Sequence, residues 1–98
     1  MSETVEVTVG VISRAHGVRG EVTVELRTDA PGERFAPGAV VHLEPAGGGP
    51  ARRATVVDHR WQGTRLVLAL DGVTDRTAAE ALRGLMILAD VDVTVHSD

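Results

Sequence analysis

Two stretches near the start of the chain alternate strictly between apolar and polar residues. Residues 4–13, TVEVTVGVIS, place a valine at every second position from Val5 to Val11, and residues 21–28, EVTVELRT, repeat the pattern with two valines and a leucine. An alternation with a period of two over such a length predicts β-strands with one buried face. We therefore predict two half-buried strands, joined by a turn over residues 14–20, RAHGVRG.

Four more segments have the composition of short strands. They are residues 39–44 (AVVHLE), 54–62 (ATVVDHRWQ), 65–70 (RLVLAL) and 85–90 (LMILAD). The connections DAPGERFAPG and PAGGGPARR are rich in proline and glycine, as loops are. The segment RLVLAL is apolar at nearly every position, which indicates burial on both faces or a place at the closure of a barrel. Whether residues 91–98, VDVTVHSD, pair with a strand stays open.

One short helix is predicted in TDRTAAEALRG, residues 74–84. Thr77 and Glu80 have the spacing of a capping box, in which each side chain bonds the free backbone amide of the other residue. The alanines and Leu82 favour a helix, and Gly84 stands where a glycine commonly ends one. Five or six short strands with one short helix predict an all-β fold, and closure into a small antiparallel barrel would remove exposed strand edges.

The length and composition fit one domain with a thin core. The chain has 98 residues, of which 43% are apolar, and a domain of this size leaves much of its surface in water. Phe35 and Trp61 are its only phenylalanine and tryptophan, and it has no tyrosine. Valine, leucine and alanine must therefore fill most of the core, with Trp61 expected inside the barrel.

The charge excludes a general electrostatic attraction to nucleic acid. The net charge is −4, whereas proteins that bind nucleic acid without specificity are usually basic. The chain also has no cysteine, no signal-peptide pattern and no apolar run long enough to span a bilayer. We expect a soluble, cytoplasmic protein that does not contact a membrane.

All ten basic residues are arginines, and several of them are clustered. The clusters are Arg14 with Arg19, Arg52 with Arg53, and Arg60 with Arg65. Two aromatic residues are too few for the base-stacking platforms of sheet-based RNA-binding proteins. The arginines are therefore interpreted either as solvated strand edges or as contacts to one specific partner.

The chain contains histidine, serine and aspartate residues, but their spacing in the sequence is not typical of a catalytic or metal-binding site. The four histidines are His16, His42, His59 and His96. They share no metal-binding spacing, and a zinc site needs three or four convergent ligands. Ser13, His16 and Asp29 form no recognisable triad, and the HGVRG segment lacks the lysine and following helix of a P-loop. We expect no catalytic residue, no metal, no cofactor and no small-molecule substrate.

Residues 9–38, VGVISRAHGVRGEVTVELRTDAPGERFAPG, resemble the start of the bacterial RimM family of ribosome maturation factors. The family pattern runs G-x-I/V, A-H-G-x-x-G-E-V, T-D, and then R-F with a downstream glycine. The matching residues are Gly10 and Ile12, Ala15 to Gly17, Gly20 to Val22, Thr28 and Asp29, Arg34 and Phe35, and Gly38. Residues 70–84, LDGVTDRTAAEALRG, resemble a second signature of the family, so the resemblance covers nearly the whole chain.

The resemblance implies an N-terminal six-stranded barrel of the translation-factor type, followed by a C-terminal barrel of the PRC type. Residues 1–98 are then expected to be the N-terminal domain alone, with residues 91–98 as a tail or linker toward the second barrel. Family members assist late maturation of the head of the small ribosomal subunit and processing of its RNA, without catalysis. They bind small-subunit ribosomal protein nineteen, largely through the second domain. This domain is expected to contact ribosomal protein or RNA of the head, aided by its tether.

The AHGVRG turn has a structural and a functional interpretation. Gly17 and Gly20 are expected to adopt backbone angles that other residues resist, which lets the two strands fold back on each other. Arg14, His16 and Arg19 would then project from one rim of the barrel and contact phosphates or acidic groups of a ribosomal partner. Alternatively, His16 bonds loop carbonyls and only holds the turn.

The segment TDAPGERF is expected to be structural. Asp29 is placed to accept hydrogen bonds from backbone amides of its own turn, and Phe35 is expected to close the open end of the barrel. Two other function classes stay open: a stand-alone RNA-binding barrel, and a small ligand-binding or enzymatic barrel with a deep polar pocket.

Overall fold

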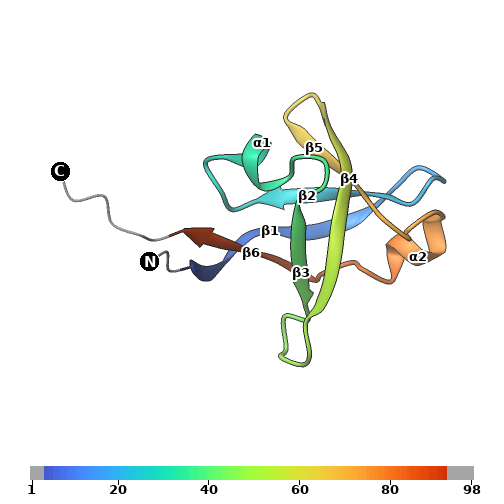
Figure 1. Ribbon diagram of the computed structural model, residues 1–98. Coiled ribbons are helices and arrows are strands. Elements are labelled where there is room, and N and C mark those ends of the chain that lie inside the picture. The colour runs from blue at the N-terminus through green and yellow to red at the C-terminus, as the bar shows by residue number, and fades with distance from the viewer. Residues whose placement is uncertain (1–3, 93–98) are drawn as a thin grey trace.

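The computed structural model describes residues 4–92. They form six strands and two short helices in the order β1 (Thr4–His16), β2 (Glu21–Leu26), α1 (Pro31–Arg34), β3 (Val40–Glu44), β4 (Arg52–Gln62), β5 (Arg65–Leu70), α2 (Arg76–Glu80) and β6 (Met86–Asp92). The strands close into one barrel in the order β1-β2-β5-β4-β3-β6, and every neighbouring pair is antiparallel (Figure 1). The predicted six-stranded closed antiparallel barrel is confirmed.

The barrel closes because β1 is long enough to pair with two neighbouring strands. Its first half pairs with β6, where Val5 lies opposite Val91, and its second half pairs with β2, where Ala15 lies opposite Val22. The start of β1 and the end of β6 lie together at one end of the molecule, and the β1–β2 turn and α2 lie at the other (Figure 1). A closed sheet leaves no free strand edge to pair with another chain.

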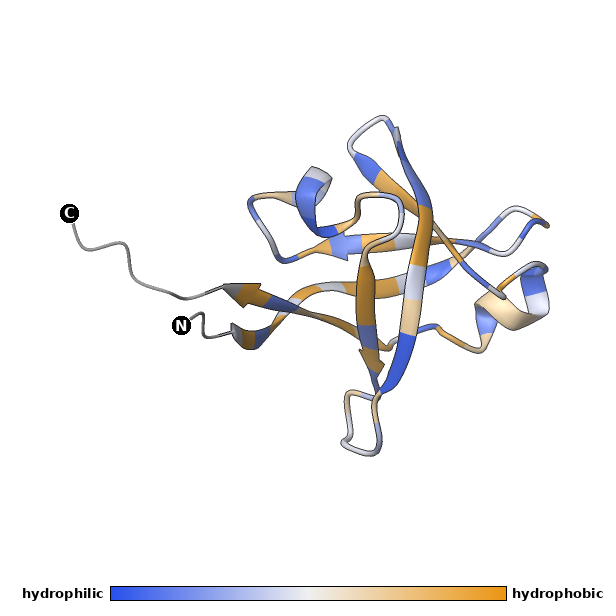
Figure 2. Cartoon of the chain, in the orientation of Figure 1, coloured by the Kyte–Doolittle hydropathy of each residue, from blue (hydrophilic) through white to orange (hydrophobic). Residues whose placement is uncertain are grey.

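Apolar side chains from all six strands fill the barrel, and Figure 2 shows apolar residues in orange along the strands. Phe35 is fully buried, and α2 adds Ala79 and Leu82 to the same core. The Phe35 ring packs close to Gly10, where an added Cβ would lie 3.6 Å from its Cζ and 2.6 Å from a Val24 methyl group. Burying a side chain of this size contributes about 2–3 kcal/mol.

The strand β1 departs from the predicted alternation. Irregular pairing, typical of β-bulges, interrupts its register with β6 after Thr8 and its register with β2 after Ile12. A bulge places one extra residue opposite the partner strand and changes which side chains face inward. Ile12 is therefore buried in place of Val11, which is only half-buried. Val5 and Val7 lie on the same face as Val9, but this end of β1 pairs with β6 alone, and the two side chains are 44% and 37% exposed. The prediction of one continuous buried valine face is wrong at both ends of the run.

The predicted capping box of the helix is also wrong. The N-cap of α2 is Asp75, whose carboxylate accepts a hydrogen bond of 2.8 Å from the backbone amide of Ala78. Aspartate caps helices at least as well as threonine does, so the helix begins one residue before Thr77. Glu80 does not reach back to a cap amide but accepts a 2.9 Å bond from Arg76, four residues earlier.

The structure also describes the loop after β2, the position of Trp61 and the start of the C-terminal segment, which the sequence had left open or predicted differently. The loop after β2 contains one helical turn, α1, with Pro31 in its first turn, where its missing amide hydrogen costs little. Trp61 is 48% exposed near the end of β4, so it does not fill the barrel. Val91 and Asp92 pair with β1, whereas residues 93–98, with His96, lie outside the described residues.

No helix in residues 4–92 is long and apolar enough to cross a membrane.

Candidate partner-binding face

The β1–β2 turn is held tightly against the segment that enters α2. Gly17 and Gly20 have φ values of +70° and +87°, in the region that favours glycine. A Cβ on Gly20 would lie 2.4 Å from the carbonyl oxygen of Val73 and 2.8 Å from the amide nitrogen of Asp75. Gly20 therefore permits both the turn and a direct backbone-to-backbone approach, while Gly17 has open space around it.

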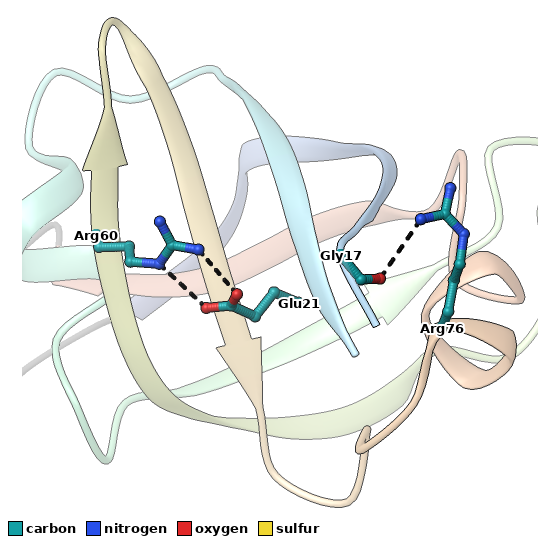
Figure 3. A network of polar contacts seen from close by, with 4 residues as sticks. All are labelled: Gly17, Glu21, Arg60 and Arg76. Carbon is teal, nitrogen blue, oxygen red and sulfur yellow. Dashed lines mark hydrogen bonds and ion pairs between the residues drawn. The ribbon is translucent and has the colours of Figure 1, made fainter. Parts of the chain in front are cut away.

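Arg76 links the helix to the same turn. Its Nη1 donates to the carbonyl oxygen of Gly17 at 3.5 Å, and its Nε donates to Glu80 at 2.9 Å (Figure 3). The guanidinium thus joins two elements that are almost sixty residues apart in the sequence. The position of the turn relative to α2 is fixed by this contact and by the close approach of Gly20.

Glu21, directly after the turn, forms a two-point ion pair with Arg60 of β4. Arg60 donates from Nη2 and Nε to the two carboxylate oxygens at 2.9 and 3.3 Å (Figure 3). These bonds hold the pKa of Glu21 below its ordinary value, against the opposite effect of partial burial, and the charges of Arg60, His16 and Arg19 lower it further. His16 and Arg19 therefore lie close enough to Glu21 for their charges to affect it. His16 is also the residue opposite Glu21 in the pairing of β1 with β2.

Arg14 belongs to a different part of this face, on the outer surface of the sheet. It lies opposite Thr23, whose hydroxyl donates to the carbonyl oxygen of Arg14 at 3.4 Å. Val22 and Val24 on either side of Thr23 face the core, so Thr23 and its partner Arg14 face outward. The side chain of Arg14 is exposed.

A groove of about 350 Å³ opens beside Arg14. We call it the arginine groove; its polar lining is Ser13, Arg14, Thr23, Glu25, Arg65 and Arg83. An adjacent hollow shares Arg14 and Arg83 and reaches Arg76 of α2. Within residues 4–92, no ion pair involves Arg14, Arg65 or Arg83, whereas Glu25 lies 3.4 Å from Arg27. The groove is therefore positively charged and open to solvent.

The structure divides the predicted binding cluster. Arg14 lines the arginine groove, whereas His16 and Arg19 lie around the turn near Glu21. Arg65 and Arg83 join the site, although the sequence pattern placed Arg65 in a different cluster and did not single out Arg83. The pairing of β2 with β5 could have indicated Arg65, because it brings the start of β5 beside Glu25. No signal in the sequence pointed to Arg83.

The remaining predicted residues lie elsewhere. Phe35 is in the core, and its carbonyl oxygen lies 2.8 Å from Nδ1 of His59. Asp29 is exposed, and the side chain that accepts from a backbone amide in this turn is that of Thr28, at 3.2 Å from Ala30. Within residues 4–92, the Asp29 carboxylate accepts none of the expected hydrogen bonds from backbone amides of its own turn.

Among residues 4–92, no group of three or more histidine, aspartate or glutamate side chains lies close enough to hold a metal ion.

Comparison with known proteins places the chain in a family. Residues 7–94 match the family model described as the RimM N-terminal domain. Among curated proteins, the chain is 49% identical over 98 residues to a ribosome maturation factor RimM from a Nocardioides species, covering 98% of this chain and 53% of that protein. It is 53% identical over 87 residues to RimM from Frankia casuarinae, covering 89% of this chain and 46% of that protein.

Two solved structures share the fold. One is a crystal structure of a 16S ribosomal RNA processing protein RimM from Pseudomonas aeruginosa, with a TM-score of 0.74 and 31% identity over 86% of this chain and 49% of that one. The other is a solution structure of the N-terminal domain of RimM from Thermus thermophilus, with a TM-score of 0.66 and 28% identity over 94% of this chain and 98% of that one.

The chain spans about half the length of the curated relatives it matches. The chain therefore belongs to the RimM family, through the N-terminal domain of that family.

Proposed function

We propose that this domain is a non-catalytic binding module of a ribosome maturation factor. It binds the small ribosomal subunit during late maturation of the head and processing of the subunit's RNA, through ribosomal protein, RNA or both. The names of the relatives support a role in ribosome maturation, and the relative from Pseudomonas aeruginosa is named as a 16S ribosomal RNA processing protein.

The observation that carries the proposal is the rigid, arginine-bearing face around the β1–β2 turn. Gly20 and Arg76 fix this turn against α2, and Arg14 and Arg19 are exposed beside it. A surface that is ordered before binding loses little conformational entropy when a partner docks. Arginine forks on such a surface suit the phosphates and carboxylates of a ribosomal partner.

We propose further that the domain works in the cytoplasm as one half of a two-barrel protein. The chain after β6 then leads toward a PRC-type barrel, which makes most of the contact with small-subunit ribosomal protein nineteen. A site of modest affinity on this domain gains from the tether, because the second binding event becomes intramolecular.

The other function classes receive less support. The interior of the barrel is filled by apolar side chains, and such an interior offers no polar cavity to a substrate or ligand. The arginine groove is an open surface feature, and among the described residues its lining contains Ser13 but no histidine, the side chain that most often acts as general base. A stand-alone RNA-binding module is opposed by the net charge of −4.

A binding titration on small subunits tests the proposal. Precursor subunits from cells depleted of this protein are titrated with the chain and with the corresponding full-length protein, alongside mature subunits. We expect the full-length protein to prefer precursor subunits, and the joint substitution Arg14→Ala and Arg19→Ala to weaken its binding about tenfold, or 1.4 kcal/mol.

The matched control is the joint substitution Arg52→Ala and Arg53→Ala, which removes the same charge from the exposed start of β4. We expect it to change the affinity less than twofold. Equal effects of the two double variants, or no preference for precursor subunits, would contradict the proposed function.

A further inference from the structure

We propose that the arginine groove binds the sugar–phosphate backbone of a single RNA strand. The inference rests on the proposed function, since the RNA in question is that of the small subunit. It adds Arg65 and Arg83 as phosphate-binding residues and Thr23 as a residue that positions Arg14.

The arginines reach the groove from three separate segments. Arg14 lies on β1, Arg65 begins β5, and Arg83 follows α2. The strand β2 lies between β1 and β5 in the barrel, so the strands that carry Arg14 and Arg65 are about two strand spacings, roughly 10 Å, apart. At this separation, one small ion would not contact both Arg14 and Arg65. An extended chain that carries several anionic groups would contact both.

Within residues 4–92, no ion pair neutralises the arginines of the groove. Arg14, Arg65 and Arg83 form no ion pair within the described residues, although Arg60 and Arg76 nearby do. Arginine stays protonated at any physiological pH. Clefts lined by charge of one sign concentrate the field and attract an oppositely charged ligand. An anionic ligand would therefore pair with guanidinium groups that form no ion pair within residues 4–92.

Glu25 does not cancel this charge. Its carboxylate lies 3.4 Å from the guanidinium of Arg27, and both side chains are more than half exposed. The groove is therefore lined by one carboxylate, which is already paired, and by three arginines that form no ion pair within the described residues. The groove keeps a net positive charge in a domain whose overall charge is negative.

The lining favours a nucleic acid backbone over an acidic protein segment. Among the described residues, Val24 is the one apolar residue that lines the groove, whereas the centres of protein–protein interfaces are rich in apolar and aromatic side chains. Phosphate contacts are made chiefly by arginine, lysine and small hydroxyl side chains. The groove offers three arginines and the exposed hydroxyl of Ser13.

Thr23 holds the backbone of Arg14 in place through a hydrogen bond. It is 2% exposed, and its hydroxyl proton is used in the bond to the carbonyl oxygen of Arg14. Thr23 therefore fixes the backbone from which Arg14 extends and does not contact the phosphate itself. The conservative change Thr23→Ser is expected to keep RNA binding, and Thr23→Val to weaken it without loss of the fold.

The first test compares two charge-matched double variants of the full-length protein on precursor subunits. Arg65→Ala with Arg83→Ala removes two groove arginines and leaves Arg14 and Arg19 in place. Arg52→Ala with Arg53→Ala removes the same charge from the start of β4. We expect the groove variant to bind about tenfold or more weakly and the control to bind like the wild type.

The salt dependence identifies the chemistry of the partner. Each lost phosphate contact lowers the slope of log K against log salt by about 0.7 to 0.9, so the groove variant should be shallower by about 1.5. An unchanged slope with weaker binding would show that Arg65 and Arg83 contact no phosphate and would overturn the RNA proposal. Groove and control variants that bind equally would overturn it too, while subunit binding that depends on Arg14 and Arg19 would leave the proposed function intact.

A second test does not depend on the subunit. The 98-residue chain, whose relative from Thermus thermophilus was solved in solution as a domain of matching extent, is titrated with a twelve-nucleotide oligouridylate and followed by the NMR signals of the arginine Nε–H groups. We expect shifts for Arg14, Arg65 and Arg83 and none for Arg52 and Arg53. No shifts in the groove, or equal shifts with polyglutamate of the same charge, would overturn the proposal even if subunit binding holds.

Discussion

Replacing Gly20 by alanine tests whether the β1–β2 turn is locked against the entrance of α2. The residue has a φ of +87°, and the added Cβ would lie 2.4 Å from the Val73 carbonyl oxygen. A left-handed alanine costs about 1–2 kcal/mol. Displacing a packed backbone adds about 1–3 kcal/mol. After the small gain from a less flexible unfolded chain, we expect a loss of about 3 kcal/mol in the free energy of unfolding.

Gly17→Ala is the matched control in the same turn. Gly17 has a similar φ of +70°, but nothing lies within 4 Å of an added Cβ. It should therefore lose only the conformational part, about 1 kcal/mol. The difference of about 2 kcal/mol measures the close approach of Gly20 to the segment before α2.

Urea unfolding followed by the fluorescence of Trp61, the only tryptophan in the chain, provides the assay. With an m-value of about 1 kcal/mol/M for a small domain, the two midpoints should differ by roughly 2 M. Equal midpoints for the two variants would refute the conclusion that this turn rests on the backbone of residues 73–75. A native NMR spectrum for Gly20→Ala with unchanged signals from the turn would refute it as well.

Three further predictions concern single side chains. Phe35→Ala should lose about 3–5 kcal/mol of unfolding free energy, because it empties the largest fully buried site, and calorimetry should show the lower Tm. Asp75→Ala should lose about 1 kcal/mol through the missing N-cap bond to Ala78, seen as a lower urea midpoint with an unchanged m-value. The pKa of Glu21 is lowered by its bonds to Arg60, so the pair stabilises the fold above the unfolded-state pKa of Glu21 and stops doing so as the pH falls through the folded-state value. Glu21→Gln should therefore be less stable than the wild type near pH 7, and the gap should close as the pH falls below 4.5; a gap that is constant with pH would contradict the role of the ion pair.

The alternation of residues predicted β1 and β2, and the composition of four further segments predicted the other strands. The removal of exposed strand edges then favoured a closed barrel. The same alternation gave the wrong buried face for β1 beyond Val9. A β-bulge shifts the register by one residue without changing the sequence pattern, so Ile12 is buried and Val11 is only half-buried. Bulges are set by the pairing of distant strands, which local periodicity does not contain.

The prediction of the helix cap was wrong because two possible caps lie close together in the sequence. Thr77 and Glu80 match the capping pattern, but Asp75 lies two residues earlier and is an equally good cap. Once the helix begins after Asp75, Arg76 stands in its first turn and reaches the carbonyl of Gly17. The order of competing caps depends on what the first turn contacts, which is a property of the folded domain.

The candidate site was only partly predictable for a similar reason. Arg14 and Arg19 lie near a conspicuous turn, so the sequence pattern was enough to single them out. Arg65 and Arg83 come to the arginine groove through the pairing of β2 with β5 and through the position of the segment after α2. Sequence distance gives no measure of either, so the division of the predicted cluster into two parts emerged only from the fold.

The most direct test of the proposed binding face is a cryo-electron microscopy map of the full-length protein on a precursor small subunit. We expect this barrel to meet the subunit through the β1–β2 turn and the arginine groove, with RNA phosphates within hydrogen-bond distance of Arg65 and Arg83. Arg52 and Arg53 at the start of β4 should then face solvent. A map in which the start of β4 meets the subunit and the arginine groove faces solvent would contradict the proposed binding face.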